Sequence, residues 1–313
     1  MNEPWENIMK LDIYLHKSNG VWGWREDYIS PPSVRINNVD VTLIQNGFRI
    51  LSLQTTKMKY KALFSFALDI IKLVQIGEGF FHNIDSIKYI ESNENEPICK
   101  KKDDLKKEDF IDFYNTYCNF VADKLELVTP AVIVTQQNYL KWKDLYLKLT
   151  IQHNAFLYYS TDNGLPINLR MANLIELCEP LAEFTCSDEV NKDCNLKNCI
   201  RQLVIKYGQD IFKKEIEAGC FDFKEKTENG NSSILQKLVN TRVNILHYKL
   251  EPKECFSNEL ERVIYCNKMH LLYRAIILKY LEIPVCSEKL RTATNYVESR
   301  LAGFDFDNYI SNY

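Results

Sequence analysis

The chain has 313 residues, of which 46% are hydrophobic and 26% are charged. This composition is typical of a soluble globular protein, and the length suffices for one large domain or two ordinary ones. The formal net charge of -3 excludes the global basic field that marks many nucleic-acid-binding proteins, so any contact with RNA must be local.

The N-terminus and the apolar runs carry no recognisable targeting signal. Met-Asn-Glu-Pro-Trp lacks the basic region and apolar stretch that define a signal peptide. No apolar run reaches the roughly 20 residues needed to span a bilayer. We therefore expect a cytoplasmic protein that does not bind a membrane.

The first part of the chain alternates between apolar and polar residues as β-strands do. An Asn46-Gly47 pair between two such runs is a turn signal. Apolar residues then fall on most helical turns of residues 62–76. We predict a β-rich N-terminal domain over residues 1–96, with strands at residues 10–16, 20–28, 33–44 and 47–53.

Residues 91–109 have no apolar periodicity and are rich in Asn and Glu, then in Lys and Asp. A basic arm is one interpretation, but the sign of the charge alternates through residues 100–107, which favours a solvated loop. We predict a linker and helical connector over residues 97–160 and a helical bundle over residues 161–313. The expected helices cover residues 108–126, 137–159, 166–184, 195–217, 232–248, 257–282 and 287–301.

Ten cysteines raise the question of a zinc site. The densest group is Cys186, Cys194 and Cys199, with Cys178 upstream. None of these forms the C-x2-C pair that anchors most structural zinc sites, and no histidine lies nearby at ligand spacing. We therefore predict no metal and no cofactor, and interpret the cysteines as reduced thiols.

The segment 232–248, SSILQKLVNTRVNILHY, carries the chemistry. On a helical wheel its apolar side chains fall within one half, and Arg242 lies near the middle of that half. His247 lies just beyond its edge, beside Gln236 and Asn240. Because an arginine cannot be neutralised, its burial is costly unless hydrogen bonds or an anion compensate.

Two interpretations of this arginine remain open. It pairs with a carboxylate of another helix, for example Glu176, Glu179 or Glu183, and braces a bundle, or it faces a cleft and binds a phosphate. His247 has the same ambiguity, because a histidine at a helix end also serves as a C-terminal cap.

The string 238–248, LVNTRVNILHY, resembles the Arg-x4-His helix of HEPN domains. Its ending in His-Tyr, after Val-x-Thr-Arg, is most similar to the Apea-like HEPN family. The next helix, through LLYRAIIL at 271–278 and closing with LEIP at 281–284, is similar to that family's final core helix. The resemblance covers residues 165–300, about half of the chain.

The resemblance implies an α+β chain in which an all-α HEPN-type bundle follows the β-rich domain and dimerises, bringing two Arg/His pairs into one cleft. Arg242 and His247 are the matching catalytic positions, and Asn240, Asn244 and Tyr248 are candidate substrate-binding or orienting residues. The family usually has a polar residue directly after the arginine. Here that residue is Val243, which weakens the expectation of full activity.

The residue types suit cleavage of RNA through its own 2′-OH. Histidine transfers protons near neutral pH, and the arginine fork holds two phosphate oxygens. We predict a metal-independent RNA endonuclease of an anti-phage defence or toxin-like system. The expected partners are RNA, a second copy bound through the 232–248 helix, and a regulatory or antitoxin protein. The alternative is an inactive HEPN-type module for dimerisation or regulation. A small-molecule enzyme lacks G-x-G-x-x-G, P-loop or G-x-S-x-G support.

Overall fold

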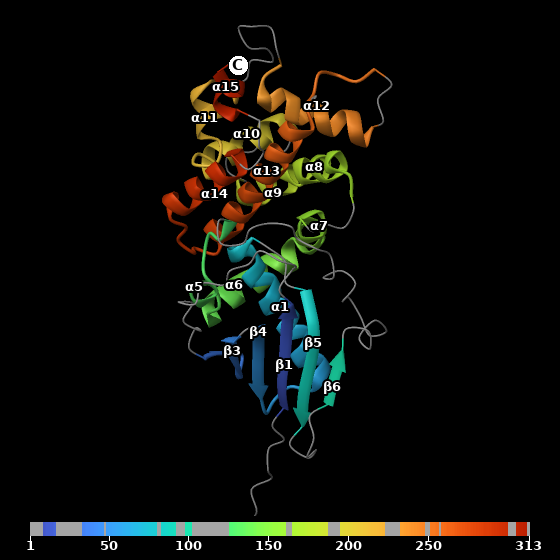
Figure 1. Cartoon of the computed structure of the whole chain (residues 1–313), viewed down its shortest axis with the longest axis vertical. Helices are drawn as coiled ribbons and strands as arrows, with labels where there is room; N and C mark the ends of the chain where they lie inside the picture. Colours follow the sequence, from blue (N-terminus) through green and yellow to red (C-terminus); the bar gives the residue numbers. More distant parts are fainter. Residues whose placement is uncertain are drawn as a thin grey trace, which may run out of the picture. The chain divides into compact units, whose positions relative to one another are not determined.

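Two compact units make up the chain, Met1–Lys148 and Leu149–Tyr313, and each is described by itself. The first contains an antiparallel sheet and the second is helical (Figure 1), which confirms the α+β prediction. The computed structural model describes residues 9–16, 33–46, 48–79, 83–91, 98–101, 125–160, 165–186, 195–222, 232–247, 251–256, 258–299 and 305–311.

The sheet of the first unit has six strands in the order β2-β3-β4-β1-β5-β6, and all neighbours pair antiparallel. Its central strand shows why this sequence forms a sheet. Leu11, Ile13 and Leu15 alternate with polar residues and are buried on one face. The strands are β1 (Met9–His16), β2 (Val34–Ile36), β3 (Val39–Asn46), β4 (Phe48–Thr55), β5 (Asn83–Glu91) and β6 (Ile98–Lys101).

The structure differs from the expected strands at two places. The single strand predicted over 33–44 is a hairpin, because Asn37 and Asn38 adopt positive φ angles of 48° and 64° and turn the chain between β2 and β3. Residues 98–101, predicted within a linker, form β6 on the sheet edge beside β5. The strand predicted over 20–28 and most of the helix over 108–126 lie outside the described residues.

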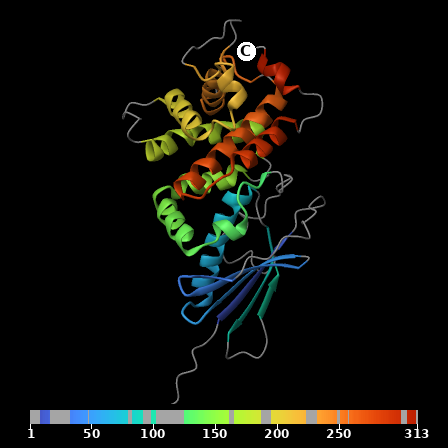
Figure 2. The ribbon, with the colours of Figure 1, turned by 90° about the vertical axis from the view of Figure 1, so that its left-hand side faces the viewer.

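Helix α1 (Tyr60–Glu78) packs against β1 and β4 (Figure 2) and contacts α5 (Pro130–Ile133) and α6 (Gln136–Lys148). It ends at Gly79, whose φ of 79° a glycine adopts at little cost. An ion pair of 2.5 Å between Lys143 and the nearly buried Asp69 ties α6 to α1.

In the second unit α13 is the central helix. It packs against α8, α10 and α14 and is buried along most of its length. The helices are α7 (Thr150–Ser160), α8 (Ile167–Glu176), α9 (Cys178–Thr185), α10 (Leu196–Tyr207), α11 (Lys213–Glu217), α12 (Ile234–Leu246), α13 (Glu259–Tyr280), α14 (Ser287–Ser299) and α15 (Phe306–Ser311).

Three of the predicted helices are interrupted. Leu149 separates α6 from α7, and Leu177 separates α8 from α9. The second break has a clear cause, because Pro180 has no N–H to donate to the carbonyl of Glu176, four residues earlier. Gly208 ends α10, and a Cβ at this position would lie 3.1 Å from the Leu272 side chain.

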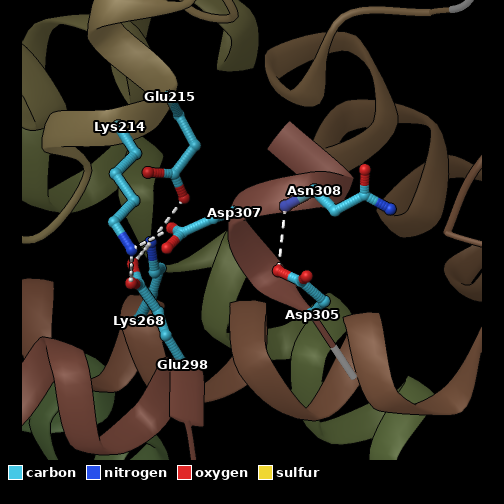
Figure 3. A network of polar contacts seen from close by, with 7 residues as sticks. All are labelled: Lys214, Glu215, Lys268, Glu298, Asp305, Asp307 and Asn308. Carbon is cyan, nitrogen blue, oxygen red and sulfur yellow. Dashed lines mark hydrogen bonds and ion pairs between the residues drawn. The ribbon is translucent and has the colours of Figure 1, made fainter. Parts of the chain in front are cut away.

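The second unit also contains a charge network whose centre, Lys268 and Glu215, is buried (Figure 3). The Lys268 Nζ lies 2.5 Å from Glu215 and 2.7 Å from Glu298, and the Lys268 and Glu215 side chains are fully buried. Lys214 joins Glu298 at 2.8 Å to Asp307 at 2.5 Å. The network therefore links α11, α13, α14 and α15.

Candidate functional site

Helix α12 carries the predicted catalytic residues and has well-defined ends. The Ser233 hydroxyl accepts a hydrogen bond from the backbone N–H of Gln236 at 3.2 Å, and His247 is the C-terminal cap. The first turns bury Ile234, Leu235 and Leu238, and α12 packs against α8. The last turns are half-buried, so the arginine lies at the rim of the bundle rather than in its core.

Arg242 contacts both an acidic partner and the predicted catalytic histidine. Its Nε and Nη2 donate to the two carboxylate oxygens of Glu176 on α8, the second over 2.9 Å. Its Nη1 lies 3.0 Å from Nε2 of His247. The Arg242 side chain is 20% exposed and the Glu176 side chain 39%, and His247 is exposed. The structure thus brings Arg242 and His247 together and selects Glu176 among the carboxylates considered as partners.

The charges of this group influence each other. The hydrogen bond to Glu176 raises the pKa of Arg242, so the guanidinium stays charged. Partial burial raises the pKa of Glu179, and the charge of Glu176 adds to this, while Arg242 lowers it. The negative charges of Glu176 and Glu179 therefore repel each other at the junction of α8 and α9, and the positive charge of Arg242 offsets part of this repulsion.

The two predicted asparagines hold a neighbouring segment. Asn244 donates to the Lys253 carbonyl at 2.7 Å and accepts from the Lys253 N–H at 3.0 Å. Asn240 donates to the Glu254 carbonyl at 2.6 Å and accepts from Gln236 at 2.9 Å. Both amides thus hold the backbone of Lys253 and Glu254 against α12. Tyr248 lies outside the described residues.

The Glu254 side chain adds further contacts between this segment and the start of α12, and the sequence did not predict this role of Glu254. It accepts from the Ser232 N–H at 3.1 Å and lies 3.6 Å from Lys237. Partial burial opposes its ionisation, but these contacts outweigh that effect and lower the pKa of Glu254. Asn240 and Asn244 are four residues apart, so their amides lie on one side of the helix. This spacing is the sequence signal for a segment that is held along α12.

Two other features of the second unit are poorer candidates. The Lys268 ammonium and the Glu215 carboxylate at the centre of the charge network are sealed from solvent, so no substrate reaches them. A pocket of about 530 Å³ lies at the ends of α10 and α13 and contains neither Arg242 nor His247; Lys206 and Lys279 there are balanced by Asp210 and Glu282. Within the described parts of the chain, no group of three or more His, Cys, Asp or Glu could hold a metal ion.

Seven of the cysteines that the structure describes are free thiols, namely Cys178, Cys186, Cys199, Cys220, Cys255, Cys266 and Cys286, and the first three of these are buried. Burial raises the pKa of Cys178, so this thiol is not a ready nucleophile. Cys194 lies outside the described residues. No helix in the described ranges has the length and apolar character to cross a membrane.

Comparisons of the chain with protein-family models, with curated proteins and with solved structures find no match. The resemblance to HEPN domains therefore rests on the residues of this chain alone.

Proposed function

We propose that the helical unit is a metal-independent RNA endonuclease of the HEPN type. The observation that supports this most is the 3.0 Å contact between Arg242 Nη1 and His247 Nε2 at the exposed end of α12. It places a permanent cation beside a group that can transfer protons near neutral pH. A scissile phosphate at this rim meets both.

The proposed reaction needs only these two kinds of group. The 2′-oxygen attacks the adjacent phosphorus while a base takes its proton, and the bond from phosphorus to the 5′-oxygen breaks as that oxygen receives a proton. The products are a 2′,3′-cyclic phosphate and a 5′-hydroxyl. His247 serves in one proton transfer, and Arg242 compensates the charge of the phosphorane.

A dimer supplies the second proton-transfer group, because each chain has one histidine in the motif. Val239, Val243 and His247 follow one another at spacings of four residues, so they share one side of α12, and the two valines are only half-buried. We propose that a second copy covers this side. Light scattering should give twice the chain mass of 36.8 kDa, whereas a stable monomer that cleaves RNA would refute the shared site.

The nuclease is tested with purified protein and total RNA in excess EDTA. Wild type should cleave, and His247→Ala and Arg242→Ala should each lower the rate by about 10²-fold or more. A matched control is His16→Ala, which removes a histidine of the first unit. If EDTA abolishes cleavage and Mg²⁺ restores it, the proposed mechanism is wrong.

An inactive HEPN-type module for dimerisation or regulation is the second candidate. Three observations favour it. Glu176 binds two nitrogens of Arg242, and Asn240 and Asn244 bind the backbone of a neighbouring segment. Val243 stands where the family that the chain resembles usually has a polar residue. Such a module should dimerise and leave RNA intact. A setting in phage defence or a toxin-like system, and an antitoxin partner, are part of the leading proposal.

A further inference from the structure

We infer that Glu176 occupies the place on Arg242 that a substrate phosphate needs, so that the described state of the site is self-inhibited. The inference rests on the proposed ribonuclease and concerns its regulation. It starts from the way in which an arginine binds oxyanions.

A guanidinium binds a carboxylate and a phosphate through the same two-nitrogen edges. In this structure the Nε/Nη2 edge of Arg242 is filled by both oxygens of Glu176. The remaining nitrogen, Nη1, faces His247. The second two-nitrogen edge, Nη1/Nη2, includes the nitrogen that contacts His247. A phosphate that binds through two nitrogens while Nη1 keeps its contact with His247 must therefore compete with Glu176.

Glu176 is held by Arg242 more than by its own helix. It is the last residue of α8, where the carbonyl ends of the helix disfavour a negative charge. Glu179, in the first turn of α9, adds further repulsion. An incoming phosphate meets these two carboxylates, so the acids oppose RNA binding until Glu176 leaves.

The exchange is physically accessible because the pair lies at the rim. The Glu176 side chain is 39% exposed and that of Arg242 is 20% exposed, so solvent reaches the pair and screens its charges in part. A released Glu176 can be solvated where it is. A nucleic acid brings several phosphates to this rim, and their combined attraction to the cation competes with a single carboxylate.

A positioning role for Glu176 makes the opposite prediction. If the carboxylate only held the guanidinium toward His247, its removal would leave Arg242 less ordered and RNA binding weaker. Substitution of Glu176 therefore separates the two roles by the sign of the change in affinity.

The test uses full-length protein and a fluorescein-labelled 2′-O-methyl oligoribonucleotide, which lacks the nucleophile and so reports binding without cleavage. Fluorescence anisotropy should show that Glu176→Gln binds about fivefold tighter than wild type or more. Glu183→Gln, on an exposed residue of α9, makes the same change in net charge and should stay within about twofold. Adding Arg242→Ala to Glu176→Gln should remove the gain.

Glu176→Ala removes the whole carboxylate and gives the result if the glutamine variant does not fold. Equal or weaker binding by the folded Glu176 variant overturns the inference, even if wild type cleaves RNA. Tighter binding through Arg242, with no cleavage of unmodified RNA by any variant, supports the inference about competition and refutes the nuclease.

Discussion

The surroundings of His270 on α13 lead us to expect that the stability of the protein depends on pH. Its ring stacks on Phe156 of α7 with centroids 4.9 Å apart, and Phe156 stacks on Tyr273 at 3.8 Å. Desolvation lowers the pKa of His270 well below its usual value, and the charges of Arg274 and Arg170 lower it further. The native ring therefore resists protonation, whereas the unfolded chain takes up the proton near pH 6.5.

Stability should accordingly fall as the pH drops below about 6.5, by up to about 1.4 kcal/mol per pH unit for this group. His270→Phe keeps an aromatic ring against Phe156 and removes the titration. Urea unfolding followed by circular dichroism at pH 7.5, 6.5 and 5.5 should show a shallower loss for this variant. The same loss of stability in both proteins would show that protonation of His270 does not contribute to the pH dependence.

At the residue scale, helical spacing relates residues of one helix but does not give their partners on other segments. Arg242 and His247 were singled out from the Arg-x4-His spacing, and they do lie in contact. The spacing could not choose between Glu176, Glu179 and Glu183, because that choice depends on how α8 packs on α12. The backbone partners of Asn240 and Asn244 come from residues 253 and 254, beyond the end of the helix, so helical periodicity could not predict them.

At the element scale, the charge network around Lys268 links α11, α13, α14 and α15 (Figure 3). Burial raises the pKa of Glu215, although the charge of Lys268 opposes this. The ammonium also lies 4.4 Å from the centre of the Phe306 ring. Removing the cation would leave the fully buried Glu215 without its ion pair to Lys268, whereas Glu298 keeps its ion pair to Lys214.

Lys268→Met, which keeps the length of the side chain, should therefore cost about 3–5 kcal/mol of stability. Adding Glu215→Gln should recover part of the loss, because one uncompensated charge disappears. Chemical denaturation followed by circular dichroism measures both. Lys213→Met, on an exposed side chain of α11, is the matched control. A Lys268→Met protein as stable as wild type would show that the network contributes nothing.

The limits of helices and strands are predictable where a residue has a strong backbone preference. The Asn46-Gly47 turn signal falls where β3 ends, at Asn46, and β4 begins, at Phe48. Asn37-Asn38 and Pro180 were available signals of the same kind and explain two of the differences. The edge strand β6 was missed because its segment is short and Lys-rich, and such strands lack apolar alternation.

For the whole molecule, the sequence predicted the α+β class because the apolar period changes from two residues to between three and four along the chain. It did not predict that α5 and α6 belong to the same compact unit as the sheet. Their apolar residues, Ile133 and Trp142 among them, are buried through tertiary packing, and periodicity does not show which partner they pack against.

The central claim is that the site of Arg242 and His247 cleaves RNA through the 2′-OH. The most direct measurement compares an oligoribonucleotide with the same sequence carrying 2′-deoxyribose throughout, both 5′-labelled and incubated with wild type or His247→Ala in EDTA. The proposed mechanism predicts that wild type cuts the ribose strand only and leaves 2′,3′-cyclic phosphate ends, and that His247→Ala cuts neither strand. Cleavage of the deoxyribose strand, equal cleavage by His247→Ala, or an intact ribose strand at every enzyme concentration would contradict it.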